Sequence, residues 1–187
     1  MAIRYKHSDE YTTYFCTFTC VNWINLFEIT NRYTSVYNWF ATLKDTYQCD
    51  VLAYVIMPNH LHCILYFKDK GFQLNKIISN GKRFMAYEII KTLEENKDTA
   101  LLKTLSGLLT EREKKKGQLH KVFKESFDAK PIFSDKFMIQ KLDYIHHNPV
   151  KCKWTLADHF TDYEHSSASF YETGLVRHFT PLHYLSV

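Results

Sequence analysis

The order of apolar segments predicts an α+β fold, in which helices pack against an antiparallel sheet. β-branched and alternating apolar runs predict strands at residues 12–20, 51–57 and 60–67. Apolar residues at helical spacing predict helices at residues 33–47 and 73–95. A strand, a helix, two consecutive strands and a helix favour antiparallel pairing with helices on one or both faces. With five glycines and no low-complexity linker, residues 1–187 are expected to form one domain.

The second and third predicted strands form a hairpin with two histidines at its turn. An apolar run ends at Ile56, residues 57–59 (Met-Pro-Asn) interrupt it, and a second run continues to Phe67. His60 and His62 begin this second strand, and side chains two residues apart on a strand project from one face. Two imidazoles on one face can bind one divalent metal ion. So close to a turn, the two rings are expected to be only partly covered.

The histidine pair alone is weak evidence for a metal site. Ten histidines in 187 residues make a chance His-x-His pair unsurprising, so a structural role is the alternative. The five cysteines include no Cys-x-x-Cys pair and are expected to be buried and reduced. Cys63 projects from the strand face opposite His62, which argues against a zinc site that uses both.

Helical signals continue in the second half of the chain. A helix is predicted at residues 99–115, followed by short strand material around residues 119–133 and a helix at residues 135–147. Ser134 is the predicted N-cap of this last helix. Residues 152–187 are expected to form irregular structure with one short helix.

Two faces of the helix at residues 135–147 differ in character. Its predicted buried stripe repeats at i, i+4 and i+7 and consists of Met138, Leu142 and Ile145. On the neighbouring face, Gln140, Tyr144 and Asn148 recur at i, i+4 and i+8. Pro149 disfavours the α region for Asn148, so the helix is expected to stop there. A tyrosine and an amide on this face can meet the two histidines, although packing is the alternative for any one of 13 tyrosines.

The two segments together resemble the REP-associated tyrosine transposases, which belong to the single-tyrosine HUH, or IS200-like, transposase superfamily. The resemblance is carried by Tyr-Val-Ile-Met-Pro-Asn-His-Leu-His at residues 54–62 and by Tyr-Ile-His-His-Asn-Pro-Val-Lys at residues 144–151. It implies a ferredoxin-like antiparallel sheet with helices packed on it. It also implies that the catalytic tyrosine lies on a separate C-terminal helix.

The resemblance further implies a metal-dependent reaction on single-stranded DNA. His60 and His62 would bind Mg²⁺ or Mn²⁺ with Asn148 as third protein ligand, at a position where relatives often carry Gln. Tyr144 would attack the scissile phosphate and form a 5′-phosphotyrosine and a free 3′-hydroxyl. Attack by a DNA 3′-hydroxyl would then rejoin or transfer strands. The DNA would contain hairpin-forming, REP-like sequences, and the protein would act as a monomer or a homodimer.

Basic residues are concentrated in one region, although the net charge of the chain is only +4. Residues 103–130 hold eight Lys or Arg against four Asp or Glu. Contact with DNA phosphates is expected, and a solvated helix end at residues 111–117 is the alternative. The predicted phosphate contacts are Lys82, Arg83, Lys115, Lys121 and Lys124. Aromatic residues that could stack on bases, or could pack in the core, are Phe123, Phe127, Trp154 and Tyr163.

The remaining sequence features concern location and competing functions. No apolar run reaches the roughly 18 residues that span a membrane, and no signal-peptide pattern is present, so a cytoplasmic, nucleoid-associated protein is expected. Two other function classes stay open. One is a non-catalytic hairpin-DNA-binding protein, which the presence of His60, His62 and Tyr144 disfavours. The other is a nickase that cleaves without transferring strands.

Overall fold

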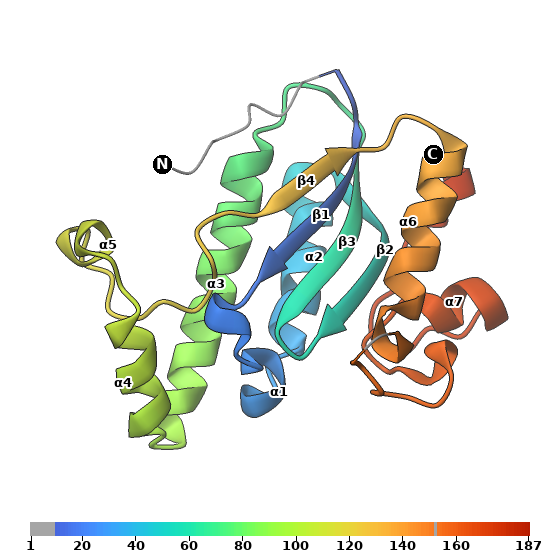
Figure 1. Ribbon diagram of the computed structural model, residues 1–187. Helices are drawn as coiled ribbons and strands as arrows, with labels where there is room; N and C mark the ends of the chain where they lie inside the picture. The colour runs from blue at the N-terminus through green and yellow to red at the C-terminus, as the bar shows by residue number, and fades with distance from the viewer. Residues whose placement is uncertain (1–9, 152) are drawn as a thin grey trace.

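An antiparallel sheet in the order β2-β3-β1-β4 forms the centre of the protein (Figure 1). The computed structural model describes residues 10–151 and 153–187. Within them, the strands are β1 (Thr13–Thr19), β2 (Cys49–Met57), β3 (His60–Phe67) and β4 (Asp128–Pro131). The predicted α+β class is confirmed. A strand order of 4-1-3-2 with helices between β1 and β2 and between β3 and β4 is the ferredoxin-like arrangement.

One face of the sheet packs against α2 (Thr34–Tyr47) and α3 (Leu74–Glu95). The short α1 (Leu26–Thr30) contributes Leu26 and Phe27 to the same core. Helices α2 and α3 approach closely where the Trp39 indole lies over Gly81. A Cβ at residue 81 would collide with the Trp39 ring. This glycine therefore allows a large aromatic ring between the two helices.

The opposite face packs against α6 (Asp135–His147) and the C-terminal segment that contains α7 (Ala168–Thr173), as Figure 1 shows. The three predicted stripe residues of α6 are all buried in this second core. Side chains of β3 alternate between the two faces of the sheet, so successive residues pack into different cores. Leu61, Cys63 and Leu65 belong to the core under α2 and α3, whereas Ile64 belongs to the core under α6. His60 and His62 therefore face α6.

Several element boundaries agree closely with the sequence-based predictions. The helices predicted at residues 33–47, 73–95 and 135–147 correspond to α2, α3 and α6 within one residue. The Ser134 hydroxyl caps α6 by accepting a hydrogen bond from the Phe137 amide. The four described cysteines are free and buried, as expected, whereas Cys152 lies outside the described residues.

The single helix predicted at residues 99–115 is wrong. Two helices, α4 (Thr99–Gly107) and α5 (Glu111–Lys115), replace it. The Thr110 side chain accepts from the Glu113 amide, and the Glu113 carboxylate accepts from the Thr110 amide. This capping box begins a new helix and so ends the continuity of the first. The strand material predicted around residues 119–133 is confined to β4 and to an isolated bridge between Cys20 and Phe123.

The predicted departure of Asn148 from helical geometry is also wrong. Asn148 has φ −53° and ψ −41°, and the chain continues into a 3₁₀ turn, η2 (Asn148–Val150). Pro149 is buried at the start of this turn, where no backbone donor is needed. Burial of the ring outweighs the usual pre-proline preference and keeps Asn148 on the same side of α6 as Tyr144. No helix in the described part of the chain is long and apolar enough to cross a membrane.

We expect Gly81→Ala to lower the free energy of unfolding by about 1–3 kcal/mol, because the added methyl group overpacks the Trp39 ring. Gly107→Ala is the matched control, since a Cβ there meets no atom within 4 Å. Urea denaturation monitored by circular dichroism measures both variants. Equal stability of the two variants would show that α2 and α3 do not depend on this close approach.

Candidate nucleic-acid cleavage site

A groove of about 1050 Å³ opens between β1, β3 and α6. Its lining includes His60, His62, Tyr144 and Asn148. The fold therefore brings together the four side chains predicted to carry the chemistry, from two sequence motifs that are about 80 positions apart.

Neighbouring side chains fix the tautomer of His60. Its Nδ1 lies 2.7 Å from Oδ1 of Asn59, whose Nδ2 donates to the Trp23 carbonyl at 2.9 Å and to Asn25 Oδ1 at 3.0 Å. Asn25 in turn donates to Glu28 through its own Nδ2. Since the Asn59 amide group is the donor in both contacts, its Oδ1 is the acceptor and His60 Nδ1 must donate. The lone pair of His60 is then on Nε2, as in histidines that bind a metal and donate from the other nitrogen.

His62 is held from two sides. Its Nδ1 lies 2.7 Å from the hydroxyl of Thr17, the residue directly opposite it in the β1–β3 register. Its Nε2 lies 3.4 Å from the hydroxyl of Tyr144. The ring also stacks on Phe15, with centroids 5.5 Å apart. These contacts orient the Nε2 edge of His62 toward α6.

The expectation that the two rings are only partly covered is wrong, because both residues are 5% exposed. Coverage comes from Trp23, Trp154 and Tyr144, whose rings contact the pair. Burial lowers the pKa of His60 to about 4, although the nearby Asn148 amide offsets part of that shift. Burial, His60 and a nearby lysine hold the pKa of His62 well below its usual range. Both imidazoles are therefore neutral at neutral pH, the state that binds a metal ion.

Asn148 supplies a further polar atom to this site. Its Oδ1 is buried and makes no well-formed hydrogen bond with any described residue. An unsatisfied buried acceptor is costly, and amide oxygens are suitable ligands for Mg²⁺ and Mn²⁺. The described residues contain no cluster of three or more His, Cys, Asp and Glu side chains that could hold a metal. Two imidazoles and an amide oxygen thus form the available donor set, and it fits such an ion.

Tyr144 differs from a packing tyrosine in its exposure. It is 42% exposed and meets the His62 ring edge-on at 5.0 Å and the Phe15 ring edge-on at 5.9 Å. By contrast, Tyr163 is buried and donates its hydroxyl hydrogen to the Ile56 carbonyl. The Tyr144 hydroxyl is therefore accessible from the groove and lies beside the histidine pair.

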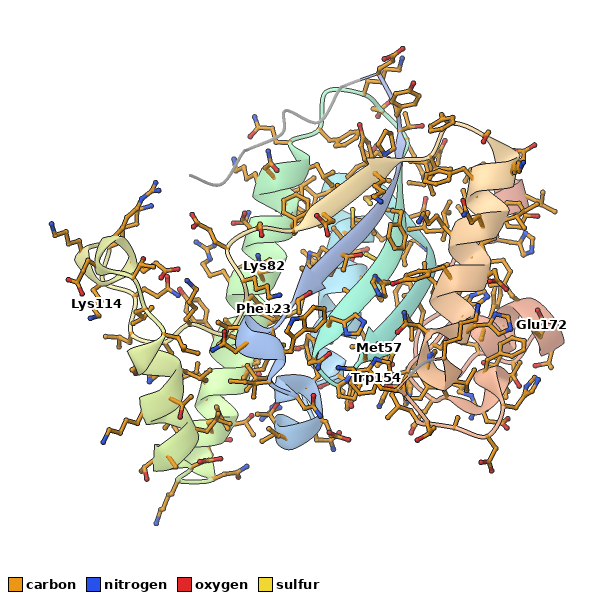
Figure 2. The ribbon with its side chains drawn as sticks, viewed as in Figure 1. Met57, Lys82, Lys114, Phe123, Trp154 and Glu172 are labelled. Atoms are coloured by element: carbon orange, nitrogen blue, oxygen red, sulfur yellow. The ribbon has the colours of Figure 1, made fainter. Side chains whose placement is uncertain are left out.

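The five basic residues predicted to contact phosphates have different environments. Lys124 lines the groove, and its Nζ lies 4.3 Å from the centre of the Trp23 ring. Lys82 is oriented inward from α3 (Figure 2) and donates to the carbonyls of Lys124 at 2.6 Å, Glu125 at 3.1 Å and Ser126 at 3.4 Å. Burial lowers the pKa of Lys82 to about 8. Its ammonium thus positions the segment that carries Lys124, which argues against direct phosphate contact.

The other three basic residues do not line the groove. Lys121 forms an ion pair with Glu113 at 2.8 Å, Lys115 lies on α5, and the Arg83 guanidinium lies 5.1 Å from the Phe84 ring centre. Their contact with DNA stays a prediction. Of the predicted stacking residues, Phe127 and Trp154 line the groove, whereas Phe123 and Tyr163 are buried in the two cores.

Four groove lysines and one tryptophan were not predicted from the sequence. Trp23 is 51% exposed in the groove, and the lysines are Lys130, Lys141, Lys151 and Lys153. A usable signal existed for Lys141, which precedes Tyr144 by three residues on the same helix and so shares its face. Trp23 gave no comparable signal, since its place depends on the backbone turn after β1.

Comparison with known proteins indicates the family and the fold of this chain. A family model described as "Transposase IS200 like" matches residues 11–106, a range that includes the histidine pair. A solved structure described as a REP-associated tyrosine transposase bound to a REP hairpin is similar to this chain, with a TM-score of 0.61 and 18% identity. That likeness covers 95% of this chain and 91% of the other, and at this identity it shows the fold alone. No curated protein sequence matches.

We expect Lys82→Ala to lower the free energy of unfolding by about 1–3 kcal/mol, because three carbonyls lose a charged donor. Affinity for a fluorescent single-stranded oligonucleotide, measured by anisotropy, should fall as well, since the segment with Lys124 loses its anchor. Arg83→Ala, the neighbouring residue on α3, is the control and should change stability little. A Lys82→Ala protein with unchanged stability would remove the anchoring role.

Proposed function

The chain belongs to the IS200-like transposases, and from that premise we propose that it cleaves single-stranded DNA through Tyr144 and then transfers or rejoins the cut strand. The observation that carries the proposal is the 3.4 Å contact between the Tyr144 hydroxyl and His62 Nε2 in an open groove. This contact keeps a nucleophile next to the donor set of His60, His62 and Asn148.

The charge of the groove supports DNA as the substrate. Five lysines and one acidic residue, Asp128, are among its described lining residues. Such an excess of positive charge attracts phosphodiesters and releases counterions on binding. The solved structure with the same fold is described as bound to a REP hairpin, which supports hairpin-forming DNA as the partner here.

The side chains of the site have different roles in the proposed cleavage. His60, His62 and Asn148 would hold Mg²⁺ or Mn²⁺, which supplies Lewis-acid polarisation of a phosphate oxygen. A tyrosine hydroxyl becomes a strong nucleophile when it loses its proton. The Lys141 ammonium lies 5.4 Å from the centre of the Tyr144 ring, so its positive charge is close to the phosphate that Tyr144 would attack. Hydrogen bonds with Asn59 Oδ1 and with the Thr17 hydroxyl keep the two imidazoles in place.

The proposed reaction exchanges one phosphodiester for another. The Tyr144 oxygen bonds to phosphorus, the bond from phosphorus to the 3′-oxygen breaks, and the leaving oxygen takes up a proton. The 5′-phosphate stays on Tyr144. Attack by a DNA 3′-hydroxyl reverses these steps, releases the tyrosine and needs no nucleotide cofactor.

Tyr144→Phe should abolish covalent attachment to DNA and preserve the fold, because it removes only the hydroxyl. The assay mixes the protein with Mn²⁺ and a pool of hairpin-bearing oligonucleotides labelled at the 3′ end, since the 3′ fragment carries the 5′-phosphate. Adducts are detected on denaturing gels. Tyr87→Phe, an exposed tyrosine on α3, is the control and should behave as wild type. An adduct in the Tyr144→Phe protein would assign the nucleophile elsewhere.

Manganese binding, measured by electron paramagnetic resonance without DNA, tests the donor set independently of activity. His60→Ala and His62→Ala should each weaken binding at least tenfold, because each removes one imidazole ligand. Asn148→Ala should weaken it, whereas Asn148→Asp should tighten it several-fold, since a carboxylate binds a hard cation better than an amide does.

Circular dichroism must accompany these measurements, because the two histidines are buried and their removal leaves cavities. Equal manganese affinity in all four folded variants would contradict the proposed ligands.

A further inference from the structure

Two of the three tryptophans of the chain flank the histidine pair. The Trp23 ring meets the His60 ring edge-on, with centroids 5.7 Å apart, and the Trp154 ring lies 6.2 Å from it at a 45° tilt. Both line the groove, whereas Trp39 lies on α2 and is buried against Gly81 of α3. In Figure 1, η1 (Val21–Trp23), between β1 and α1, and the segment after α6 lie on the two sides of the β2–β3 hairpin.

A lysine ammonium group lies over each of these two indole rings. Lys124 Nζ lies 4.3 Å from the Trp23 ring centre, and Lys153 Nζ lies 5.3 Å from the Trp154 ring centre. An exposed contact between an ammonium and an aromatic ring is weaker than stacking of a base on that ring. A nucleotide can therefore displace the lysine from the ring, and the lysine then remains within reach of the phosphate of that nucleotide.

The backbone around Trp23 shows that this exposure is imposed by the structure. Trp23 has φ 59° and Asn22 has φ 49°, a left-handed conformation that is unfavourable for a bulky side chain. The Trp23 amide donates to the Cys20 carbonyl, and the Trp23 carbonyl accepts from Asn59 Nδ2. Asn59 also orients His60, so one side chain fixes both the indole and the imidazole. The result is a half-exposed tryptophan in the groove.

Trp154 reaches the same region from the opposite side of the fold. Its backbone amide donates to the Lys151 carbonyl, and its ring packs partly against the core under α6. Figure 2 shows Trp154 near Met57, the last residue of β2, at the end of the sheet where the hairpin turns. The two indoles thus come from unconnected segments and meet at His60.

We propose that Trp23 and Trp154 form a base clamp that stacks on nucleotides on either side of the scissile phosphate, with Lys124 and Lys153 neutralising the adjoining phosphates. This proposal rests on the proposed function, because it assumes that a DNA strand lies in the groove. Stacking on an indole requires a base that is not paired in a duplex, so the clamp selects unpaired strand with little dependence on sequence. It also explains why two large aromatic rings are kept beside a polar site.

Intrinsic tryptophan fluorescence gives a direct test. The probes are a 12-nucleotide oligothymidine and an abasic strand with the same number of phosphates, both with EDTA present so that no cleavage occurs. We expect the oligothymidine to quench the fluorescence and the abasic strand to leave it nearly unchanged, since Trp39 is buried and the two groove indoles report stacking.

Variants separate stacking from charge. Trp23→Ala and Trp154→Ala should each lower affinity for the oligothymidine about fivefold or more, with little effect on the abasic strand. Trp23→Phe should keep most of the affinity because it retains an aromatic face. Lys124→Ala should weaken binding of both probes and flatten the salt dependence. Thermal unfolding shows whether each variant is folded.

Three results would overturn the clamp. They are oligothymidine binding without a fluorescence change, equal losses of affinity on both probes in folded Trp→Ala variants, and unchanged affinity in those variants. The adduct assay keeps the two proposals distinguishable. Quenching without any adduct supports the clamp and contradicts cleavage by Tyr144, whereas an adduct with unchanged oligothymidine affinity in the Trp→Ala variants does the reverse.

Discussion

The hydrogen bonds of Asn59 are the constraint on which the rest of the site depends. This residue occupies the turn between β2 and β3, and its side chain joins η1, the start of α1 and His60. Its Oδ1 fixes which nitrogen of His60 carries the proton, while its Nδ2 fixes the carbonyl of Trp23. One buried amide therefore couples the turn of the hairpin, the direction of an imidazole lone pair and the position of an exposed indole. Removal of any one partner would leave a buried polar group unsatisfied.

The alternation of β3 and the pitch of α6 then bring the two halves of the site together. Side chains of odd number on β3 fill the core under α2 and α3, so His60 and His62 must face α6. On α6, the buried stripe fixes the rotation of the helix, which aims Tyr144 at His62 and keeps Asn148 near His60. The polar contact between the two halves, from Tyr144 to His62, is long at 3.4 Å, so packing energy sets their relative geometry.

The sequence sufficed to predict those features that depend on local periodicity. The boundaries of α2, α3 and α6, the Ser134 cap and the shared faces of the motif residues follow from patterns of two and 3.6 residues. Burial of the histidines could not be predicted, because the rings that cover them come from η1, α6 and the segment after it. Inward orientation of Lys82 likewise depends on three carbonyls about 42–44 residues away. Four of the five groove lysines were not predicted for the same reason. They belong to separate segments of the sequence that only the tertiary fold brings together.

The central claim is that Tyr144 becomes covalently joined to DNA, and mass spectrometry of the adduct tests it most directly. Trypsin should release residues 142–151 as one peptide, because Lys141 and Lys151 bound it, and Tyr144 is its single tyrosine. After nuclease digestion of the bound strand, this peptide should carry the added mass of a nucleotide 5′-phosphate on Tyr144. The same mass on a peptide with any other tyrosine, or cleaved DNA without a modified peptide, would contradict the account.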